Sequence, residues 1–456
     1  MTAFLSSLRA WASLPLLVTG LVPSAAFGAT AAASQIEIKA ELDRSTLQAG
    51  EAQKAYLRIL IATSRRPESR RAPMNVALVI DRSGSMASAG RMDNARKAAQ
   101  MAVDRLGRDD ILSVVSYDDR VDVEVPATKV TDASRIKERI GRLTPRGSTA
   151  IHAGLLAGAE EVRKFKSKDR VNRIILLSDG LANVGPSKPS DFVSLGRELA
   201  SEGMTVSTIG LGTGYNEDLM AGLARSADGG HVFVQESADL ANFLSREFDD
   251  ALGIVGQQVD IIITLSDGVK PLRSLGRDAD IKGNKIVYKV GALFGGTEQV
   301  LLAELEVDAR TPVGTGDIAK IEVVYQDAAN GGSRTVSANA SAVFEADRQV
   351  SEKSINAEVM KDVATLLSRA VRQEAIELRD AGRIDEAKRK FEQNADYVRA
   401  QQAKAPSAAA YAPLADELQA NEAAAATANQ GGEAWSKARK TQRAIDSNKP
   451  GASVKY

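Results

Sequence analysis

The spacing of hydrophobic residues divides the chain into stretches of different character. Alternating apolar and polar residues, as in "IEIKAEL" and "AYLRILIA", predict half-buried strands between residues 35 and 62. From Met74 to about residue 252, apolar runs such as "VALVID" and "RIILLSD" alternate with stretches of helical spacing such as "RMDNARKAAQMAVDRL". Strands buried on both faces and alternating with helices are typical of βαβ units, so an α/β domain with a mainly parallel sheet is expected over residues 73–252.

Two other patterns follow the α/β region. Residues 253–350 contain strand-like stretches such as "VDIIITLSDG" and "KIVYKVGAL", which predict an all-β, sandwich-like domain whose sheets the N-terminal segment 29–72 completes. Residues 351–403 have helical spacing interrupted at Gly382, which predicts a helical hairpin. Residues 404–456 are rich in Ala, Ser, Gln and Asn, so a low-complexity, partly disordered tail with weak helix around 411–426 is expected.

The N-terminal residues 1–28 have the pattern of a signal peptide. Arg9 precedes an apolar run, and the small residues Ala26 and Gly28 fit cleavage after Gly28. A membrane anchor is the alternative, but proline and glycine residues shorten the apolar helix. Since no later stretch is long and apolar enough to span a bilayer, the sequence predicts an exported protein, periplasmic or secreted, with no transmembrane segment after cleavage.

Composition narrows the chemistry. The 456 residues include 59 Lys and Arg against 59 Asp and Glu, and this zero net charge argues against a nucleic acid or an anionic membrane as partner. The absence of cysteine excludes disulfides and thiol chemistry. Only two histidines are present, His152 and His231, so candidates for acid–base catalysis are few.

Three short motifs carry oxygen-bearing side chains at the predicted ends of strands or starts of helices. "DRSGS" supplies Asp81, Ser83 and Ser85, "GSTAI" supplies Thr149, and "LSDG" supplies Asp179. Because ligands of open parallel sheets bind at the carboxyl ends of the strands, we expect these three loops to meet.

The spacing within the first motif suits a metal ion. Alternate side chains of extended backbone project to one side, so positions 81, 83 and 85 can face one point while Arg82 and Gly84 face away. Two carboxylates and three hydroxyls are hard ligands, which suit Mg²⁺, Ca²⁺ or Mn²⁺ and not Zn²⁺ or Cu²⁺. The alternative is that the two aspartates merely cap helices.

Together the three motifs resemble those of von Willebrand factor type A domains with a metal-ion-dependent adhesion site. The resemblance covers roughly residues 73–252 and implies a Rossmann-like fold, with the five residues above coordinating one divalent cation, some through water. The wider layout is similar to bacterial exported proteins of this kind, to inter-α-trypsin inhibitor heavy chains and to so-called calcium-activated chloride channel homologues. Ser88 and Ala89 stand where integrin-type sites have an acidic pair, so no second ion is expected there, and the H-E-x-x-H motif of the chloride-channel regulators is absent.

The favoured hypothesis is a non-enzymatic, exported protein-binding module for adhesion or scaffolding, in which the cation captures an Asp or Glu carboxylate of a protein partner. Asp118, Asn216 and Glu217 are candidates for the rim that contacts this partner. An assembly factor of an envelope complex is one alternative, and a metal-assisted hydrolase, which would need a base or nucleophile at the ion, is another. The pattern leaves open the partner, the choice between Mg²⁺ and Ca²⁺, and the oligomeric state.

Overall fold

The computed structural model describes residues 35–64, 72–309, 312–328, 330–403, 412–447 and 452–454. The predicted signal peptide over residues 1–28 lies outside these ranges. Within them, no helix combines the length and apolar character needed to cross a membrane.

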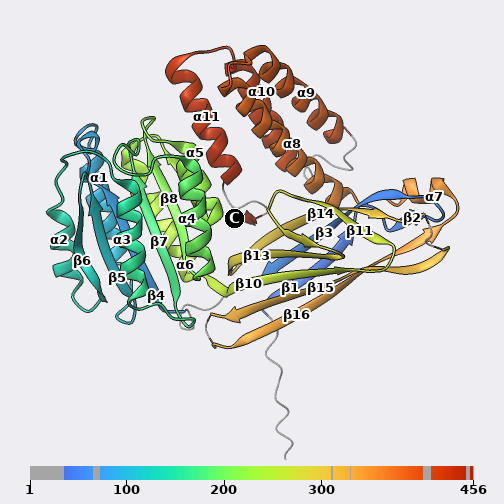
Figure 1. The fold of residues 1–456 in the computed structure, drawn as a ribbon, viewed down its shortest axis with the longest axis horizontal. Helices are drawn as coiled ribbons and strands as arrows, with labels where there is room; N and C mark the ends of the chain where they lie inside the picture. Colours follow the sequence, from blue (N-terminus) through green and yellow to red (C-terminus); the bar gives the residue numbers. More distant parts are fainter. Residues whose placement is uncertain are drawn as a thin grey trace, which may run out of the picture. The chain divides into compact units, whose positions relative to one another are not determined.

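The α/β domain is built on a six-stranded sheet with the order β6-β5-β4-β7-β8-β9. All neighbouring strands are parallel except β6, which runs antiparallel to β5 at the sheet edge. The predicted α/β class with a mainly parallel sheet is therefore confirmed (Figure 1). The strands are β4 (Met74–Asp81), β5 (Ile111–Tyr117), β6 (Val121–Lys129), β7 (Val171–Ser178), β8 (Thr205–Leu211) and β9 (Asp228–Val234).

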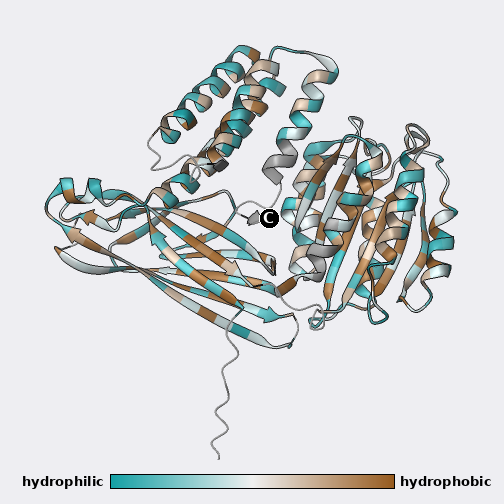
Figure 2. Cartoon of the chain, turned by 180° about the vertical axis from the view of Figure 1, so that it is seen from behind, coloured by the Kyte–Doolittle hydropathy of each residue, from teal (hydrophilic) through white to brown (hydrophobic). Residues whose placement is uncertain are grey.

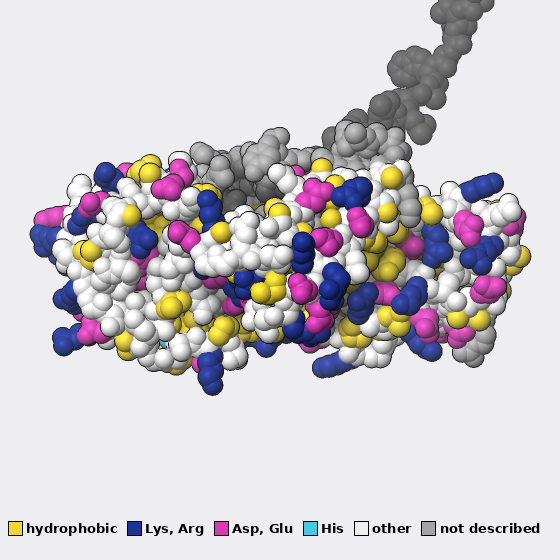
Figure 3. Space-filling view, turned by 90° about the horizontal axis from the view of Figure 1, so that it is seen from above, with side chains coloured by type: hydrophobic (Ala, Val, Ile, Leu, Met, Phe, Trp, Pro, Cys, Tyr) yellow, Lys and Arg dark blue, Asp and Glu magenta, His cyan; other side chains and the backbone are white. Residues whose placement is uncertain are grey.

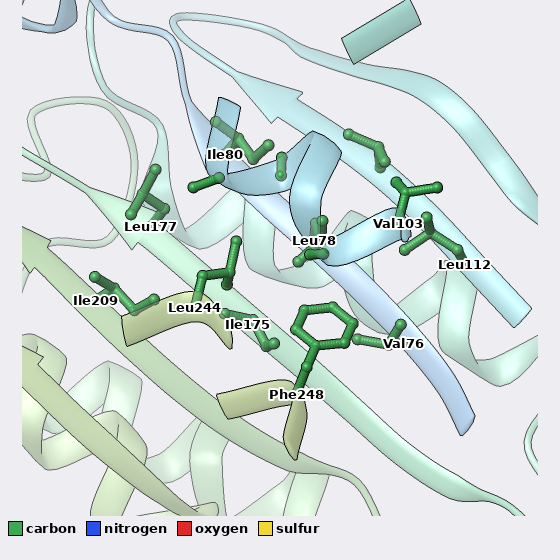
Figure 4. Packing of buried hydrophobic residues seen from close by; sticks show 14 of the residues in the cluster. Val76, Leu78, Ile80, Val103, Leu112, Ile175, Leu177, Ile209, Leu244 and Phe248 are labelled. Atoms are coloured by element: carbon green, nitrogen blue, oxygen red, sulfur yellow. The ribbon is translucent and has the colours of Figure 1, made fainter. Parts of the chain in front are cut away.

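Helices cover both faces of this sheet because the central strands are apolar on both sides. On β4, Val76, Leu78 and Ile80 pack toward α1, α2 and α6, whereas Ala77 and Val79 pack toward α3, α4 and α5. Figure 4 shows the first of these cores, with Phe248 lying beside Val76 and Ile175. The helices are α1 (Arg91–Val103), α2 (Ala133–Gly141), α3 (Ile151–Arg163), α4 (Pro189–Ser201), α5 (Glu217–Ser226) and α6 (Leu240–Leu252), with short 3-10 turns η2 (Gly84–Ala87) and η3 (Ser237–Asp239).

The all-β part consists of two sheets that share one apolar core. One sheet has the order β1-β3-β14-β11, with β17 also paired to β14, and the other has the order β12-β13-β10-β15-β16-β2. The strands of the first are β1 (Ile36–Leu42), β3 (Gln53–Thr63), β11 (Val269–Leu275), β14 (Thr297–Val307) and β17 (Ala452–Val454). Those of the second are β2 (Thr46–Gln48), β10 (Ile254–Leu265), β12 (Asp280–Lys282), β13 (Lys285–Phe294), β15 (Gly314–Asp327) and β16 (Ser333–Glu345).

The N-terminal strands belong to this β-sandwich. Strand β3 pairs with β14 along its length, from Gln53 opposite Val307 to Ala62 opposite Glu298. The α/β domain is thus inserted between β3 and β10 of the sandwich. The two parts also differ in hydropathy. Figure 2 shows that the strands of the central α/β sheet are mostly hydrophobic, whereas the sandwich strands mix hydrophobic and hydrophilic positions.

The helices after the sandwich include the expected hairpin. Gly382, at φ +81°, ends α8, and α9 begins two residues later, as the left-handed cap predicts. Val359, Val363 and Leu366 of α8 pack on Leu275 and Leu302 of the sandwich. The helices of this region are α7 (Arg348–Lys353), α8 (Ala357–Asp380), α9 (Ile384–Gln402), α10 (Ala412–Thr427) and α11 (Gly432–Ser447).

Helix α10 agrees with the weak helix expected around residues 411–426, whereas α11 lies where only a partly disordered tail was expected, and residues 404–411, 448–451 and 455–456 lie outside the described residues. Ala424 of α10 and Trp435 of α11 pack against Ile376 of α8 and Phe391 of α9. Small alanine side chains let the helices approach closely, so few large apolar residues suffice. A buried ion pair between Arg372 and Glu417, with Nη1–Oε2 at 2.6 Å, adds a specific contact that composition does not reveal.

Candidate metal centre

The two predicted aspartate ligands lie at the carboxyl ends of neighbouring strands. Strand β4 ends at Asp81, and Asp179 follows the end of β7, which pairs in parallel with β4. Ser178 Oγ donates to Asp81 Oδ2 at 2.7 Å, and the backbone NH of Ser83 donates to Asp81 Oδ1 at 2.8 Å. The carboxylate of Asp81 is therefore fixed from both sides.

The predicted hydroxyl residues converge on the same point. Ser83 Oγ and Ser85 Oγ are 3.0 Å apart, and Ser85 Oγ donates to Asp179 Oδ1 at 2.6 Å. A Cβ atom added to Gly180 would lie 3.4 Å from Ser85 Oγ and 3.5 Å from Thr149 Oγ1. The structure thus brings together all five side chains that the sequence nominates, from three separate loops.

Backbone hydrogen bonds connect the three loops. The NH of Gly84 donates to the carbonyl of Gly147 at 3.1 Å. The NH of Thr149 donates to Asn183 Oδ1 at 2.7 Å, and the NH of Asn183 returns a bond to the carbonyl of Thr149 at 3.1 Å. Because each loop is held by its neighbours, the oxygen atoms are preorganised rather than free to move apart.

The burial of Asp81 tests whether these residues fit a cation. Asp81 is fully buried, and burial raises its pKa to about 6 while hydrogen bonds from Ser178 and Ser83 lower it in part. Its hydrogen-bond donors are neutral, so they solvate the carboxylate without cancelling its charge. A buried carboxylate among hydroxyl oxygens has the chemistry that a hard divalent cation completes, and the set fits one such ion.

The candidate set contains only two carboxylates. In the part of the chain that the structure describes, no three His, Cys, Asp or Glu side chains cluster as a metal site. The site would therefore depend on serine and threonine hydroxyls for its remaining protein ligands. Two carboxylates and three neutral hydroxyls would balance the charge of a divalent ion, and five protein ligands leave at least one position for water or an external anion.

Arg91, which the sequence does not single out, contacts one of the proposed ligands. It begins α1, and its Nη1 donates to Asp179 Oδ2 at 2.6 Å, on the oxygen that Ser85 does not bind. The guanidinium fixes the orientation of Asp179 and offsets part of its charge. Gly90, which has a left-handed backbone at φ +64°, directly precedes α1 and is the sequence feature that marks Arg91 as the first residue of the helix.

The structure corrects the prediction that Asp118 lies on the partner-binding rim. Asp118 is fully buried and accepts from Arg82 Nε at 2.8 Å and Arg146 Nε at 2.7 Å. Although burial favours the neutral acid, bonds from Arg146, the backbone of Arg120 and Arg82 lower its pKa to about 2. The Arg82 side chain pairs with Asp118, Asp122 and Glu124 and with none of the predicted ligands, which agrees with the direction that the spacing predicts.

The other two rim candidates also have partners within the chain. Asn216 is the N-cap of α5, where its Oδ1 accepts from the NH of Leu219 at 3.1 Å. Glu217 is buried and paired with Arg439 and Lys440 of α11. Glu217 is therefore occupied by contacts within the chain, whereas the half-buried Asn216 stays a candidate for the rim.

The two histidines have neutral contact partners, although the Lys440 ammonium lies near enough to His231 to add to the effect of burial in lowering its pKa. His152 contacts Phe192 edge to face, with ring centroids 5.5 Å apart. His231 is fully buried between Thr208 Oγ1 at 2.9 Å and the phenol of Tyr215 at 3.1 Å, and burial lowers its pKa to about 3.

Comparison with known proteins identifies the class. Residues 75–246 match the family model described as the von Willebrand factor type A domain, so the chain contains such a domain. Domains of this class are commonly protein-interaction modules and typically bind a divalent cation through such a site.

Individual relatives extend the match beyond this domain. An uncharacterised protein of Synechocystis sp. is 28% identical over 343 residues, which cover 73% of this chain and 80% of that protein. Inter-α-trypsin inhibitor heavy chain H3 of Pongo abelii is 26% identical over 37% of this chain, but the match spans only 20% of the heavy chain. The solved structure of a von Willebrand factor type A protein from Catenulispora acidiphila has a TM-score of 0.72 at 18% identity, covering 92% of this chain and 98% of that one, and so shares the fold.

Proposed function

We propose that the protein is an exported, cation-dependent protein-binding module for adhesion or scaffolding. One Mg²⁺ or Ca²⁺, with Mn²⁺ as a substitute, is held by Asp81, Ser83, Ser85, Thr149 and Asp179. A carboxylate from an Asp or Glu of the partner completes its coordination. The observation that carries this proposal is the convergence of two carboxylates and three hydroxyls from three loops at one edge of the sheet.

The loop after Asp179 supplies the surface next to the ion. Leu181 is 57% exposed and Val184 is 36% exposed, and the NH of Val184 donates to the carbonyl of Thr149 at 3.3 Å. These aliphatic side chains lie on the loop that carries Asp179 and is hydrogen-bonded to Thr149. They suit a partner whose carboxylate lies beside an apolar surface, because the central part of a protein interface is more apolar than its rim.

Charge and location agree with a protein partner. On the face shown in Figure 3, Lys and Arg side chains are interspersed with Asp and Glu, without a broad surface of one sign. Such a surface does not favour nucleic acid. The signal-peptide pattern of residues 1–28 supports export to the periplasm or the exterior.

The alternatives receive less support from the geometry. Hydrolysis needs a base or nucleophile at the metal. His231 is buried with Thr208 and Tyr215, and His152 packs against Phe192. We therefore propose a non-enzymatic role, and assembly of an envelope complex is one form that the same cation-dependent binding could take.

Direct cation binding tests the proposal. Isothermal titration of the metal-free protein with Mn²⁺ should give one site in the wild type and none in Asp81→Ala or Asp179→Asn. Asp93→Asn is the matched control, since Asp93 is an exposed carboxylate on α1, paired with Arg96. Thermal unfolding of each variant checks that the fold is retained. A wild type that binds no Mn²⁺, Mg²⁺ or Ca²⁺ at millimolar concentration would refute the proposal.

A further inference from the structure

The segment 212–217, between β8 and α5, lies directly against the candidate metal centre. A Cβ atom added to Gly214 would come within 2.8 Å of the carbonyl oxygen of Asp179. One added to Gly212 would come within 2.9 Å of Arg91 Nη2. The two glycines therefore let this segment, which we call the rim segment, contact both a proposed ligand and the arginine that orients it.

Helix α11 holds the rim segment from the opposite side. Lys440 is only 3% exposed, its Nζ donates to the carbonyl of Tyr215 at 2.9 Å, and it forms an ion pair with Glu217. The same ammonium group lies 4.8 Å from the centroid of the Tyr215 ring. The lysine thus contacts the backbone, the ring and the neighbouring carboxylate of the rim segment at once.

Arg439 reinforces this contact. Its guanidinium pairs with Glu217, with Asp218 at 2.5 Å and with Asp380 of α8 at 2.6 Å. One residue thereby links the α/β domain, α11 and the preceding helices. Arg439 and Lys440 thus pair with the acidic N-terminus of α5, although they are 221 to 223 residues away from it in the sequence.

The buried location distinguishes these contacts from ordinary surface ion pairs. An exposed ion pair contributes little because water and salt screen it, whereas a buried ammonium group is costly unless its partners are fixed. Glu217 is 6% exposed, so both members of its pair with Lys440 are removed from water. Such a pair forms only if α11 docks in one position against the rim segment.

The rim segment is also fixed from within the α/β domain, at the position that Lys440 contacts. The phenol of Tyr215 is hydrogen-bonded to His231, and a Cβ atom at Gly210 would meet the Tyr215 ring at 2.2 Å. Tyr215 therefore cannot move without disturbing β8 and β9. Only two residues, Thr213 and Gly214, separate Tyr215 from Gly212, so a shift of the Tyr215 backbone would also displace the glycines that lie against Arg91 and Asp179.

We propose that the acidic surface made by the Tyr215 carbonyl, Glu217 and Asp218 is a docking site for α11, and that this docking is coupled to cation binding at Asp179. The inference rests on the cation site of the proposed function. When α11 is docked, the rim segment holds Asp179 and Arg91 in the geometry that binds the ion. When α11 leaves, the segment loosens and cation affinity falls. By linkage, the ion in turn stabilises the docked helix.

The test measures docking and cation affinity separately in the full chain. Lys440→Met keeps most of the aliphatic stem but removes the ammonium group. Lys437→Met is the matched control, because Lys437 is exposed on the same helix. Hydrogen–deuterium exchange reports the docking of α11, and Mn²⁺ titration reports the affinity. We expect Lys440→Met to speed exchange of α11 amides and to weaken Mn²⁺ binding, each by about five-fold or more, with both values unchanged in Lys437→Met.

The reciprocal measurement uses the metal as the variable. Saturating Mn²⁺ should slow exchange of α11 in the wild type and should have no effect in Asp179→Asn. The double variant Arg439→Met/Lys440→Met serves where one substitution leaves α11 docked. Thermal unfolding confirms that each variant remains folded.

The outcomes separate the two proposals. A wild type that binds no cation refutes the proposed function and the coupling with it. If the wild type binds Mn²⁺ but a variant with undocked α11 binds it equally well, the coupling alone is wrong. Unchanged exchange of α11 in both the single and the double variant overturns the assigned docking contacts.

Discussion

Two buried aspartates at the ends of neighbouring strands have opposite surroundings. Asp81 is the last residue of β4 and Asp118 follows β5, and both are fully excluded from solvent. Asp118 lies between two guanidinium groups, which hold its pKa at about 2 against the effect of burial. Asp81 has neutral donors from Ser83 and Ser178, and burial raises its pKa to about 6.

The difference supports the proposal that Asp81, and not Asp118, binds a cation. The charge of Asp118 is already compensated by Arg82 and Arg146, so an added ion would gain little there. The charge of Asp81 is solvated but uncompensated by its hydrogen-bond donors, and the hydroxyls of Ser83 and Ser85 lie beside it. Burial alone therefore does not identify a candidate ligand. Asp118 has two guanidinium partners, whereas Asp81 has neutral donors and Asp179 has one guanidinium partner, Arg91, and keeps its other oxygen on the Ser85 hydroxyl.

The largest expected loss of stability comes from replacing Asp118, the aspartate that has two arginine partners. Asp118→Ala leaves Arg82, itself only 6% exposed, without its buried partner. Removing one member of a buried ion pair typically costs 3–5 kcal/mol, and we expect about 3 kcal/mol because Asp122 and Glu124 still bind Arg82. Asp81→Ala should cost less, about 1 kcal/mol in chelator, since it removes an uncompensated buried charge. Urea unfolding of the metal-free variants measures both, and equal losses would contradict the contrast.

The sequence predicts Asp81 better than it predicts Asp118. Apolar runs locate the strand ends, and the alternation in "DRSGS" indicates which side chains share a direction, so all five nominated ligands converge. Asp118 also follows a strand, which made it a reasonable rim candidate. Its role depends on Arg82 and on Arg146, which is 28 residues away, and no local pattern encodes that pairing.

The same limitation applies to the C-terminal helices. Local patterns predict the hairpin over 351–403 because its helical spacing and Gly382 are signals within a few residues. Helix α11 lacks a broad apolar stripe, and its docking depends on Arg439 and Lys440 meeting Glu217. A charge run in a sequence is usually solvated, so this contact is visible only in three dimensions.

A second prediction extends the comparison to His231, another buried group with neutral partners. Burial lowers its pKa from 6.5 to about 3, so folding disfavours the charged imidazole. The stabilising effect is complete above pH 6.5 and is lost as pH falls from 6.5 toward 3, because only the unfolded chain readily binds the proton. The slope is about 1.4 kcal/mol per pH unit in that window.

His231→Gln isolates this effect, since glutamine can bond to Thr208 and Tyr215 but does not titrate. Urea unfolding at pH 7.5, 6.0 and 5.0 should show that the difference between wild type and variant shifts in favour of the variant as pH falls. A difference that does not change with pH would mean that His231 is not held neutral in the folded protein.

The smallest expected loss of stability concerns the hydrogen bond between Thr149 and Asn183, which connects two loops of the candidate metal centre. Asn183→Ala removes the acceptor for the NH of Thr149, which is 4% exposed, and should cost about 1 kcal/mol of stability. Mn²⁺ affinity should also fall, because Thr149 Oγ1 loses the support that holds it near Ser85. Asn183→Asp keeps an acceptor oxygen and should restore stability. If alanine weakens stability but leaves Mn²⁺ affinity intact, the position of Thr149 is set by the rest of its loop and this hydrogen bond has no part in cation binding.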